Sequence, residues 1–231
     1  MLRGLDGFGL YLAFLIPPLL LGLGMQAWLK RSFAHNAAIA VGSGLTGADV
    51  ARAILDHNGL QQVPVNQSPG GPLSDHYDPK KRAVFLSSAV HGERSISATA
   101  VGAHEVGHAI QHATGDAFMR FRSAMFPAVA LSSSLWIWLL LAGALLQATG
   151  LILVALVLYS IAVLFHFVTL PVEFDASRRA LAQLRELNLV TEPEGAGARK
   201  VLTAAAMTYV AGALAALTQL LYYVLVYFGN R

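Results

Sequence analysis

Four long runs of apolar residues constrain the fold more strongly than any other feature of this sequence. They cover roughly residues 8–29, 124–147, 150–170 and 203–228, and about 20 apolar residues are enough to cross the hydrocarbon core of a bilayer. The composition agrees, because 55% of the 231 residues are hydrophobic and only 13% are charged. The sequence therefore predicts a multi-pass membrane protein and excludes disordered, collagen-like and coiled-coil chains.

The first run is predicted to remain in the protein as a signal anchor. Its apolar stretch is longer than that of a secretory signal peptide, it ends in Lys30 and Arg31, and no small-residue cleavage site follows. We therefore expect an N-terminal transmembrane helix within residues 1–30.

The distribution of Lys and Arg predicts which side of the membrane each connection occupies. Segment 30–122 carries Lys80, Lys81 and Arg82 besides positive residues at both of its ends, whereas the turn at 147–150 carries neither Lys nor Arg. The long segment should therefore be cytoplasmic, in a plasma (inner) membrane, with both chain termini outside.

The charge and the lack of cysteine limit the chemistry. The formal net charge is +3, but the 16 Lys and Arg are spread along the chain without a basic run, so no nucleic-acid partner is expected. The sequence contains no cysteine, which excludes disulfides, thiolate zinc sites and cysteine nucleophiles. Any metal must therefore be held by histidine and carboxylate side chains.

Segment 31–123, between the first two apolar runs, has the pattern of a small α+β body. Thr46 is placed to cap a short amphipathic helix, and Gly59 is placed to end it. Residues 63–65 and 82–87 are predicted to form two short strands, since turn-forming residues separate them.

The strongest chemical signal is a His-Glu-x-x-His sequence at residues 104–108. His104 and His108 lie one helical turn apart on the same face, so both imidazoles can reach one Zn²⁺. Glu105 lies between them, beside the water that the zinc would activate. The alternative is a helix with incidental surface histidines and glutamate.

A zinc hydrolase needs a third protein ligand. The metzincin class would place a histidine six residues after His108, where Thr114 stands, so a downstream carboxylate is the remaining source. Glu173 and Asp175 follow the third apolar run and point about 200° apart on a helix, so only one of them should reach the metal. We favour Glu173 because its side chain is longer, with Asp175 as the alternative. Asp175 would otherwise orient a histidine or pair with Arg179.

Four segments together resemble the YugP-like family of putative neutral zinc metallopeptidases, which are multi-pass bacterial membrane proteins. They are TGADVAR at 46–52, LSDHYDP at 73–79, HEVGHAIQ at 104–111 and PVEFDASRRA at 171–180. The resemblance extends over most of residues 10–225. It implies a membrane-embedded zinc-dependent peptidase with a zincin-like body.

Residues 173–176 are also similar, more remotely, to the Glu-x-x-Ala-Asp ligand motif of the HtpX and CAAX-protease group of membrane gluzincins. In that group the glutamate binds zinc and an aspartate follows the alanine. Ser177 stands in the place of that aspartate in this chain. The resemblance therefore leaves open whether Asp175 takes over the role of the aspartate.

The predicted fold is mainly α, with four transmembrane helices and a small α+β cytoplasmic zincin-like body. The expected parts are the anchor helix at 1–30, the zincin-like region at 31–123, a transmembrane hairpin at 124–171, a cytoplasmic segment with the third zinc ligand at 172–202, and a C-terminal transmembrane helix at 203–231.

The predicted reaction is peptide hydrolysis with Glu105 as the general base, which takes a proton from the attacking water and later protonates the leaving amine. His76 or Tyr77, expected in a loop before a strand, are candidates for stabilising the oxyanion, although a simple turn is the alternative there. The strand at 82–87 is expected to bind an extended substrate as an additional strand, which predicts broad specificity.

Two further histidines lie near these features. His112 continues the stripe of His104 and His108, but it lies too far along the helix axis to share a tetrahedral ion and is predicted to lie outside the coordination sphere. His166 lies within the third apolar run, where an ionisable group is a functional candidate and a structural hydrogen bond is an equal alternative.

The expected site lies at the cytoplasmic membrane surface, because residues 113–123 lead from the motif helix directly into the second run and Glu173 follows the third. Substrates should then be membrane proteins or juxtamembrane segments, and a complex or a homo-oligomer is a further expected partner. A catalytically silent membrane scaffold or adaptor is the competing function. A channel or transporter is disfavoured, because the four apolar runs hold almost no charge.

Overall fold

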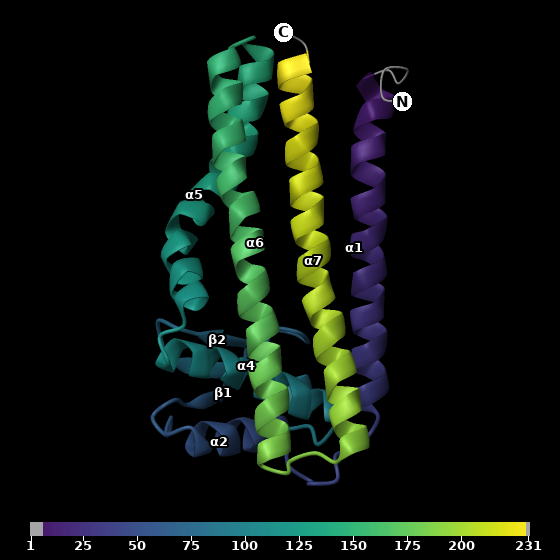
Figure 1. Cartoon of the computed structure of the whole chain (residues 1–231), viewed down its shortest axis with the longest axis vertical. Helices are drawn as coiled ribbons and strands as arrows, with labels where there is room; N and C mark the ends of the chain where they lie inside the picture. Colours follow the sequence, from purple (N-terminus) through teal and green to yellow (C-terminus); the bar gives the residue numbers. More distant parts are fainter. Residues whose placement is uncertain (1–6, 230–231) are drawn as a thin grey trace. The chain divides into compact units, whose positions relative to one another are not determined.

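The computed structural model describes residues 7–229 (Figure 1). Its elements are α1 (Gly7–Ala37), α2 (Gly47–His57), β1 (Val65–Gln67), β2 (His76–Asp78), β3 (Ala83–Leu86), α3 (Ser88–His91), α4 (Ile96–Ala113), α5 (Ala117–Leu145), α6 (Thr149–Glu186) and α7 (Glu192–Gly229). Two compact units are present. The helical unit comprises the described residues of Met1–Gln26, Phe121–Leu170 and Thr208–Arg231, and the mixed unit comprises Ala27–Arg120 and Pro171–Met207.

Four helices, α1, α5, α6 and α7, are long and apolar enough to cross a membrane, as the sequence predicts. Each of them extends beyond the apolar run that it contains. Helix α6 continues from Thr149 to Glu186 through Pro171, although a proline contributes no N–H donor to the helix. Glu173 and Asp175 are therefore carried on the same helix as the third apolar run.

The mixed unit contains a three-stranded sheet in which β3 is central, in the order β1-β3-β2. Asn66 of β1 lies opposite Phe85 in a parallel pair, and Tyr77 of β2 lies opposite Val84 in an antiparallel pair. Both edges of β3 are therefore paired, and the prediction that strand 82–87 binds a substrate as an additional strand is wrong. A largely buried strand of this kind is typical of the centre of a sheet.

The sequence locates the strands less well than the helices. It predicts a strand at 63–65, which the structure has at Val65–Gln67, and it predicts a loop where β2 lies. Three residues are too few to show a recognisable alternation of polar and apolar side chains, and Pro79 directly follows the strand. His76 and Tyr77 are thus strand residues.

Helices α2 and α4 pack against each other and against the sheet to form the core of the mixed unit (Figure 1). Helix α2 begins with the predicted cap, because the Thr46 side chain accepts a hydrogen bond from the Asp49 N–H and the Asp49 carboxylate accepts one from the Thr46 N–H. Gly59 follows its end with a φ of +72°, as predicted. A Cβ at Gly102 would lie 2.5 Å from Gly47 O, so these glycines allow the two helices to touch.

Helix α4 does not lead directly into the second span, which corrects the expectation from the sequence. It ends at Ala113, and a turn separates it from α5. Gly115 in this turn has a φ of +68°, which glycine adopts without strain. The Asp116 side chain then accepts a hydrogen bond from the Met119 N–H and caps α5.

Candidate metal centre

Three potential ligands converge within the mixed unit. His104 and His108 lie one turn apart on α4, and Glu173 comes from α6. Glu173 Oε2 lies 3.3 Å from His104 Nε2 and 3.5 Å from His108 Nε2. One ligand atom from each side chain lies within 4.8 Å of the other two. The structure thus brings together the three residues that the sequence predicts as metal ligands.

The Glu173 carboxylate is almost completely buried, with 2% of the residue exposed. Burial alone raises the pKa of Glu173, but the hydrogen bonds and positive charges that His104 and His108 supply when protonated, without a metal, hold this pKa below the usual range of a glutamate. The carboxylate is therefore kept in the charged form that binds metal ions.

Close packing of α4 on α6 allows these side chains to converge. A Cβ at Gly107 would lie 2.5 Å from the backbone oxygen of Ala176, which is closer than real Cβ contacts. Gly107 is the second variable residue of the His-Glu-x-x-His sequence, and Ala176 follows Glu173 by three residues on α6. The glycine thus has a packing role beside the ligands.

Glu105 lies on α4 between the two histidines and is 7% exposed. Burial raises the pKa of Glu105 to about 7. The charges of Glu173 and Asp75 act in the same direction, whereas the charge of His104 and a hydrogen bond from the Tyr77 backbone oppose the rise. A carboxyl group with such a pKa can both accept and donate a proton near neutral pH.

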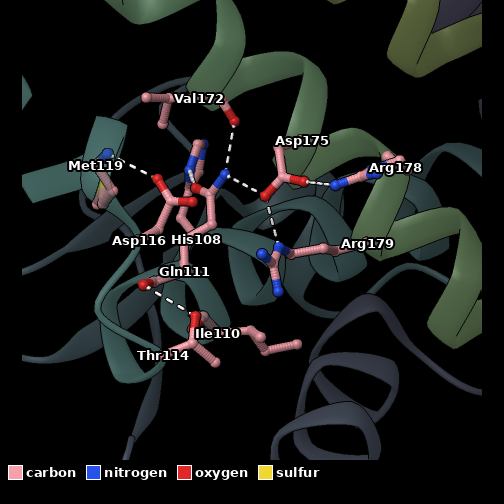
Figure 2. Close-up of polar contacts among 10 residues, drawn as sticks. All are labelled: His108, Ile110, Gln111, Thr114, Asp116, Met119, Val172, Asp175, Arg178 and Arg179. Carbon is pink, nitrogen blue, oxygen red and sulfur yellow. Dashed lines mark hydrogen bonds and ion pairs between the residues drawn. The ribbon is translucent and has the colours of Figure 1, made fainter.

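The Nδ1 atom of each imidazole contacts a further polar side chain. His108 Nδ1 lies 3.0 Å from Gln111 Oε1, and Figure 2 shows these two side chains together. His104 Nδ1 lies 3.2 Å from Ser177 Oγ. Contacts of this kind fix the ring orientation of a ligand and leave Nε2 for the metal. Neither Gln111 nor Ser177 is predicted from the sequence as a partner of these histidines, although the position of Gln111 three residues after His108 on a helix is a signal that could reveal it.

Asp175 is surrounded by hydrogen-bond donors (Figure 2). Its carboxylate accepts hydrogen bonds from Arg178, from Arg179 Nε at 2.5 Å and from Gln111 Nε2 at 3.0 Å. Burial alone raises the pKa of Asp175, but the bonds from Arg179, Gln111 and Arg178 lower it to about 2. The predicted pairing of Asp175 with Arg179 is confirmed.

The two candidates for stabilising the oxyanion are neighbours on β2, so their side chains point to opposite faces of the sheet. His76 is exposed, with its ring stacked on Phe85 and its Nδ1 2.9 Å from Ser74 O. The Tyr77 hydroxyl lies 2.8 Å from His112 Nδ1, which connects β2 to α4. The role of His76 in catalysis stays a prediction.

His166 belongs to the helical unit, on α6. Its ring lies 3.9 Å from the position that a Cβ on Gly212 would occupy, so a glycine of α7 faces the imidazole. This proximity distinguishes neither alternative, and both the structural hydrogen bond and the functional role of His166 stay predictions.

A known protein family matches nearly the whole chain. The family described as putative neutral zinc metallopeptidase matches residues 11–228. The chain belongs to this family. The putative membrane protease YugP of Bacillus subtilis (strain 168) is 44% identical to it over 213 residues, which cover 90% of this chain and 94% of that protein. No solved structure matches the chain.

Membership in a zinc metallopeptidase family implies zinc, and the residues of the metal centre fit this ion. Two imidazoles and one carboxylate are a ligand set of catalytic zinc sites. Zinc–ligand bonds of about 2.0–2.1 Å in a tetrahedral site separate the ligand atoms by roughly 3.3–3.5 Å. Glu173 Oε2 lies 3.3 and 3.5 Å from the two imidazole nitrogens.

Proposed function

We propose that this protein is a membrane-embedded zinc endopeptidase that holds its metal with His104, His108 and Glu173. The observation that carries the proposal is the approach of one buried carboxylate on α6 to two imidazoles on α4. The family and the membrane protease of Bacillus subtilis support the same activity.

The proposed mechanism gives Glu105 the proton transfers. Zinc, when bound, supplies a Lewis acid that activates water for attack on a peptide carbonyl. Glu105 accepts a proton from the attacking water and donates it to the amine of the departing peptide. Because burial raises the pKa of Glu105 to about 7, the same carboxyl group can perform both steps near neutral pH.

An extended substrate is proposed to bind along β2. Within the described sheet β2 pairs on one side with β3, and the Tyr77 backbone forms a hydrogen bond with Glu105. An edge strand beside the general base can align a peptide through backbone hydrogen bonds with little sequence preference. His76, exposed on the same strand, is the proposed stabiliser of the oxyanion. The His76→Ala variant should then lose activity while it retains zinc.

The proposed substrates are membrane proteins or their juxtamembrane segments, cleaved on the cytoplasmic side. The positive residues of segment 30–122 support this orientation. The position of Glu173, three residues after the third apolar run on the same helix, supports a site close to the membrane.

The orientation can be tested by labelling single cysteines, because the chain has none of its own. Lys80 is exposed in the mixed unit, and Leu146 is exposed at the hairpin between α5 and α6. A membrane-impermeant maleimide should label Leu146→Cys in intact cells and Lys80→Cys only after the cells are opened. The opposite pattern would reverse the proposed orientation.

The activity is tested with the detergent-purified full chain, by measuring bound zinc and the cleavage of an unstructured, fluorescently labelled protein. The Glu105→Gln variant should retain zinc and lose cleavage by at least about 100-fold, as expected for removal of a general base. The Glu93→Gln variant makes the same chemical change at an exposed glutamate and should behave like the parent. A parent chain that binds zinc without cleaving any substrate would favour the silent scaffold.

Single replacements distinguish the two candidate carboxylates. The Glu173→Gln variant should lose zinc, whereas the Asp175→Asn variant should retain it with weaker affinity, because Asp175 accepts hydrogen bonds from Arg178, Arg179 and Gln111. Loss of zinc in the Asp175 variant alone would show that Asp175 is the ligand.

A further inference from the structure

Gln111 is among the largest side chains of the protein that are completely buried. Its amide makes three polar contacts, all within the mixed unit. Nε2 donates hydrogen bonds to Val172 O at 2.9 Å and to Asp175 Oδ2 at 3.0 Å, and Oε1 lies 3.0 Å from His108 Nδ1 (Figure 2). Leaving a polar atom of a buried amide without a hydrogen bond is energetically costly. The amide should therefore adopt the orientation in which all three contacts are hydrogen bonds.

The partners of Gln111 fix the orientation of its amide. A backbone carbonyl and an ionised carboxylate only accept hydrogen bonds, so the NH₂ group must face Val172 and Asp175. The amide oxygen therefore faces His108 and must accept a hydrogen bond from the Nδ1–H group. His108 is thereby held as the tautomer whose Nε2 carries the lone pair, and this atom is the one that points toward Glu173 Oε2.

The same amide connects the two helices that carry the proposed ligands. His108 and Gln111 belong to α4, whereas Val172 and Asp175 lie on either side of Glu173 in α6. A shift of α6 along α4 would break at least one of the three contacts. The orientation of His108 and the position of Glu173 are therefore coupled through one side chain.

The two proposed histidine ligands differ in the group that contacts Nδ1. His104 Nδ1 meets the neutral hydroxyl of Ser177 at 3.2 Å. His108 Nδ1 is connected through Gln111 to Asp175, whose charge is held in place by Arg178 and Arg179. A carboxylate at the end of such a chain increases the basicity of the ligand.

We propose that Gln111 is a positioning residue of the metal centre, which fixes the tautomer of His108 and aligns Glu173 with it, with Asp175 as its anchor. This inference rests on the proposed zinc site. It assigns to Gln111 a contribution to metal affinity that acts through His108.

The test measures the zinc affinity of the full chain in detergent by competition with a chromophoric chelator, together with the thermal unfolding of the zinc-free protein. The Gln111→Met variant keeps the side-chain volume but removes the amide, and it should weaken zinc binding about 10- to 100-fold. The Ser177→Ala variant is the matched control on His104, and it should weaken zinc binding less than Gln111→Met does. Zinc affinity of Gln111→Met within about twofold of the parent would overturn the proposal.

A double-mutant cycle separates positioning from general destabilisation. In the His108→Ala background, Gln111→Met should weaken the residual zinc binding much less than it does in the parent, because only the contacts of Gln111 with α6 remain for the substitution to remove. An unchanged 10- to 100-fold loss in that background would also overturn the proposal.

If Gln111→Met does not fold, the Asp175→Asn variant tests the proposal instead, because it removes the charge that anchors Gln111 and retains the shape of the side chain. It should weaken zinc binding about 3- to 10-fold, which is less than the loss expected when the Gln111 amide itself is removed. An affinity equal to that of the parent would contradict the proposal. A parent chain that binds no zinc would instead contradict the proposed function.

Discussion

The two compact units differ in how completely the protein itself buries their apolar side chains. The core of the mixed unit contains completely buried residues such as Ile54, Leu86 and Leu184. In the helical unit large apolar side chains remain exposed, among them Leu145 at 84% and Trp138 at 68%. Hydrocarbon around a membrane span covers apolar side chains without any protein contact, whereas a unit in water must cover them itself.

The units differ even more in their buried polar side chains. The mixed unit contains charged, imidazole and amide side chains that are at most 7% exposed, among them Glu105, His108, Gln111 and Glu173. The buried polar side chains among the described residues of the helical unit are the hydroxyl groups of Ser132 and Thr169. Burying a charged or amide group is unfavourable unless it finds a partner. The concentration of such groups around two helices therefore marks the place where chemistry is expected.

The largest expected difference in stability is between alanine variants of two leucines on helix α6. Leu184 lies in the part of α6 that belongs to the mixed unit and is completely buried, whereas Leu164 lies in the helical unit and is 51% exposed. The Leu184→Ala variant should lower the free energy of unfolding by about 2–5 kcal/mol, because it leaves a cavity in a packed core. The Leu164→Ala variant should change it by less than about 1 kcal/mol. Equal losses in chemical denaturation of the detergent-solubilised protein would show that both leucines are packed alike.

A smaller effect is expected from two glycines. A Cβ at Gly107 would press on Ala176 O at 2.5 Å, whereas among the described residues no atom lies within 4 Å of a Cβ at Gly22 in α1. The Gly107→Ala variant should cost about 1–3 kcal/mol of stability through overpacking. It should also reduce the zinc content, because α6 carries Glu173 and must move away from α4. The Gly22→Ala variant should match the parent or exceed its stability slightly.

Both measurements on the glycine variants are needed. A Gly107→Ala protein that unfolds more easily but binds zinc as tightly as the parent would show that the helix contact matters for stability alone. A loss of zinc in Gly22→Ala as well would contradict the contrast between the two units.

The sequence predicts those features that depend on local patterns. The four spans are long apolar runs, and the helix at 47–57 is defined by Thr46 and Asp49 at its start and Gly59 behind its end. His104 and His108 share one helical face because of their spacing alone. Each of these predictions uses residues at most a few turns apart, and the structure agrees with each placement.

The features that the sequence misses depend on packing between distant segments. Strand β2 is short and is defined by its pairing with β3, not by a pattern of its own. The contact of Gln111 with Asp175 joins residues 64 positions apart, and nothing in the local pattern of α4 indicates which residue of α6 it meets. Ser177 beside His104 is a case of the same kind.

The smallest expected effect is on kcat/KM, from removing a hydroxyl contact between β2 and α4. Tyr77 engages α4 twice, through its backbone at Glu105 and through its hydroxyl 2.8 Å from His112 Nδ1. The Tyr77→Phe variant removes only the hydroxyl contact, and a hydrogen bond of this kind contributes about 1 kcal/mol. If the contact holds the edge strand beside the general base, kcat/KM for peptide cleavage should fall about fivefold while the zinc content stays constant.

The control for this prediction lies in the helical unit, where Tyr227 donates a longer hydrogen bond of 3.5 Å to Thr149 O. The Tyr227→Phe variant makes the same chemical change and should leave kcat/KM unchanged. A split between a raised KM and an unchanged kcat in Tyr77→Phe would indicate that the contact aligns the bound peptide in both ground and transition states. Equal activity of the two variants and the parent would mean that the Tyr77 backbone contact with Glu105 suffices to hold β2 in place.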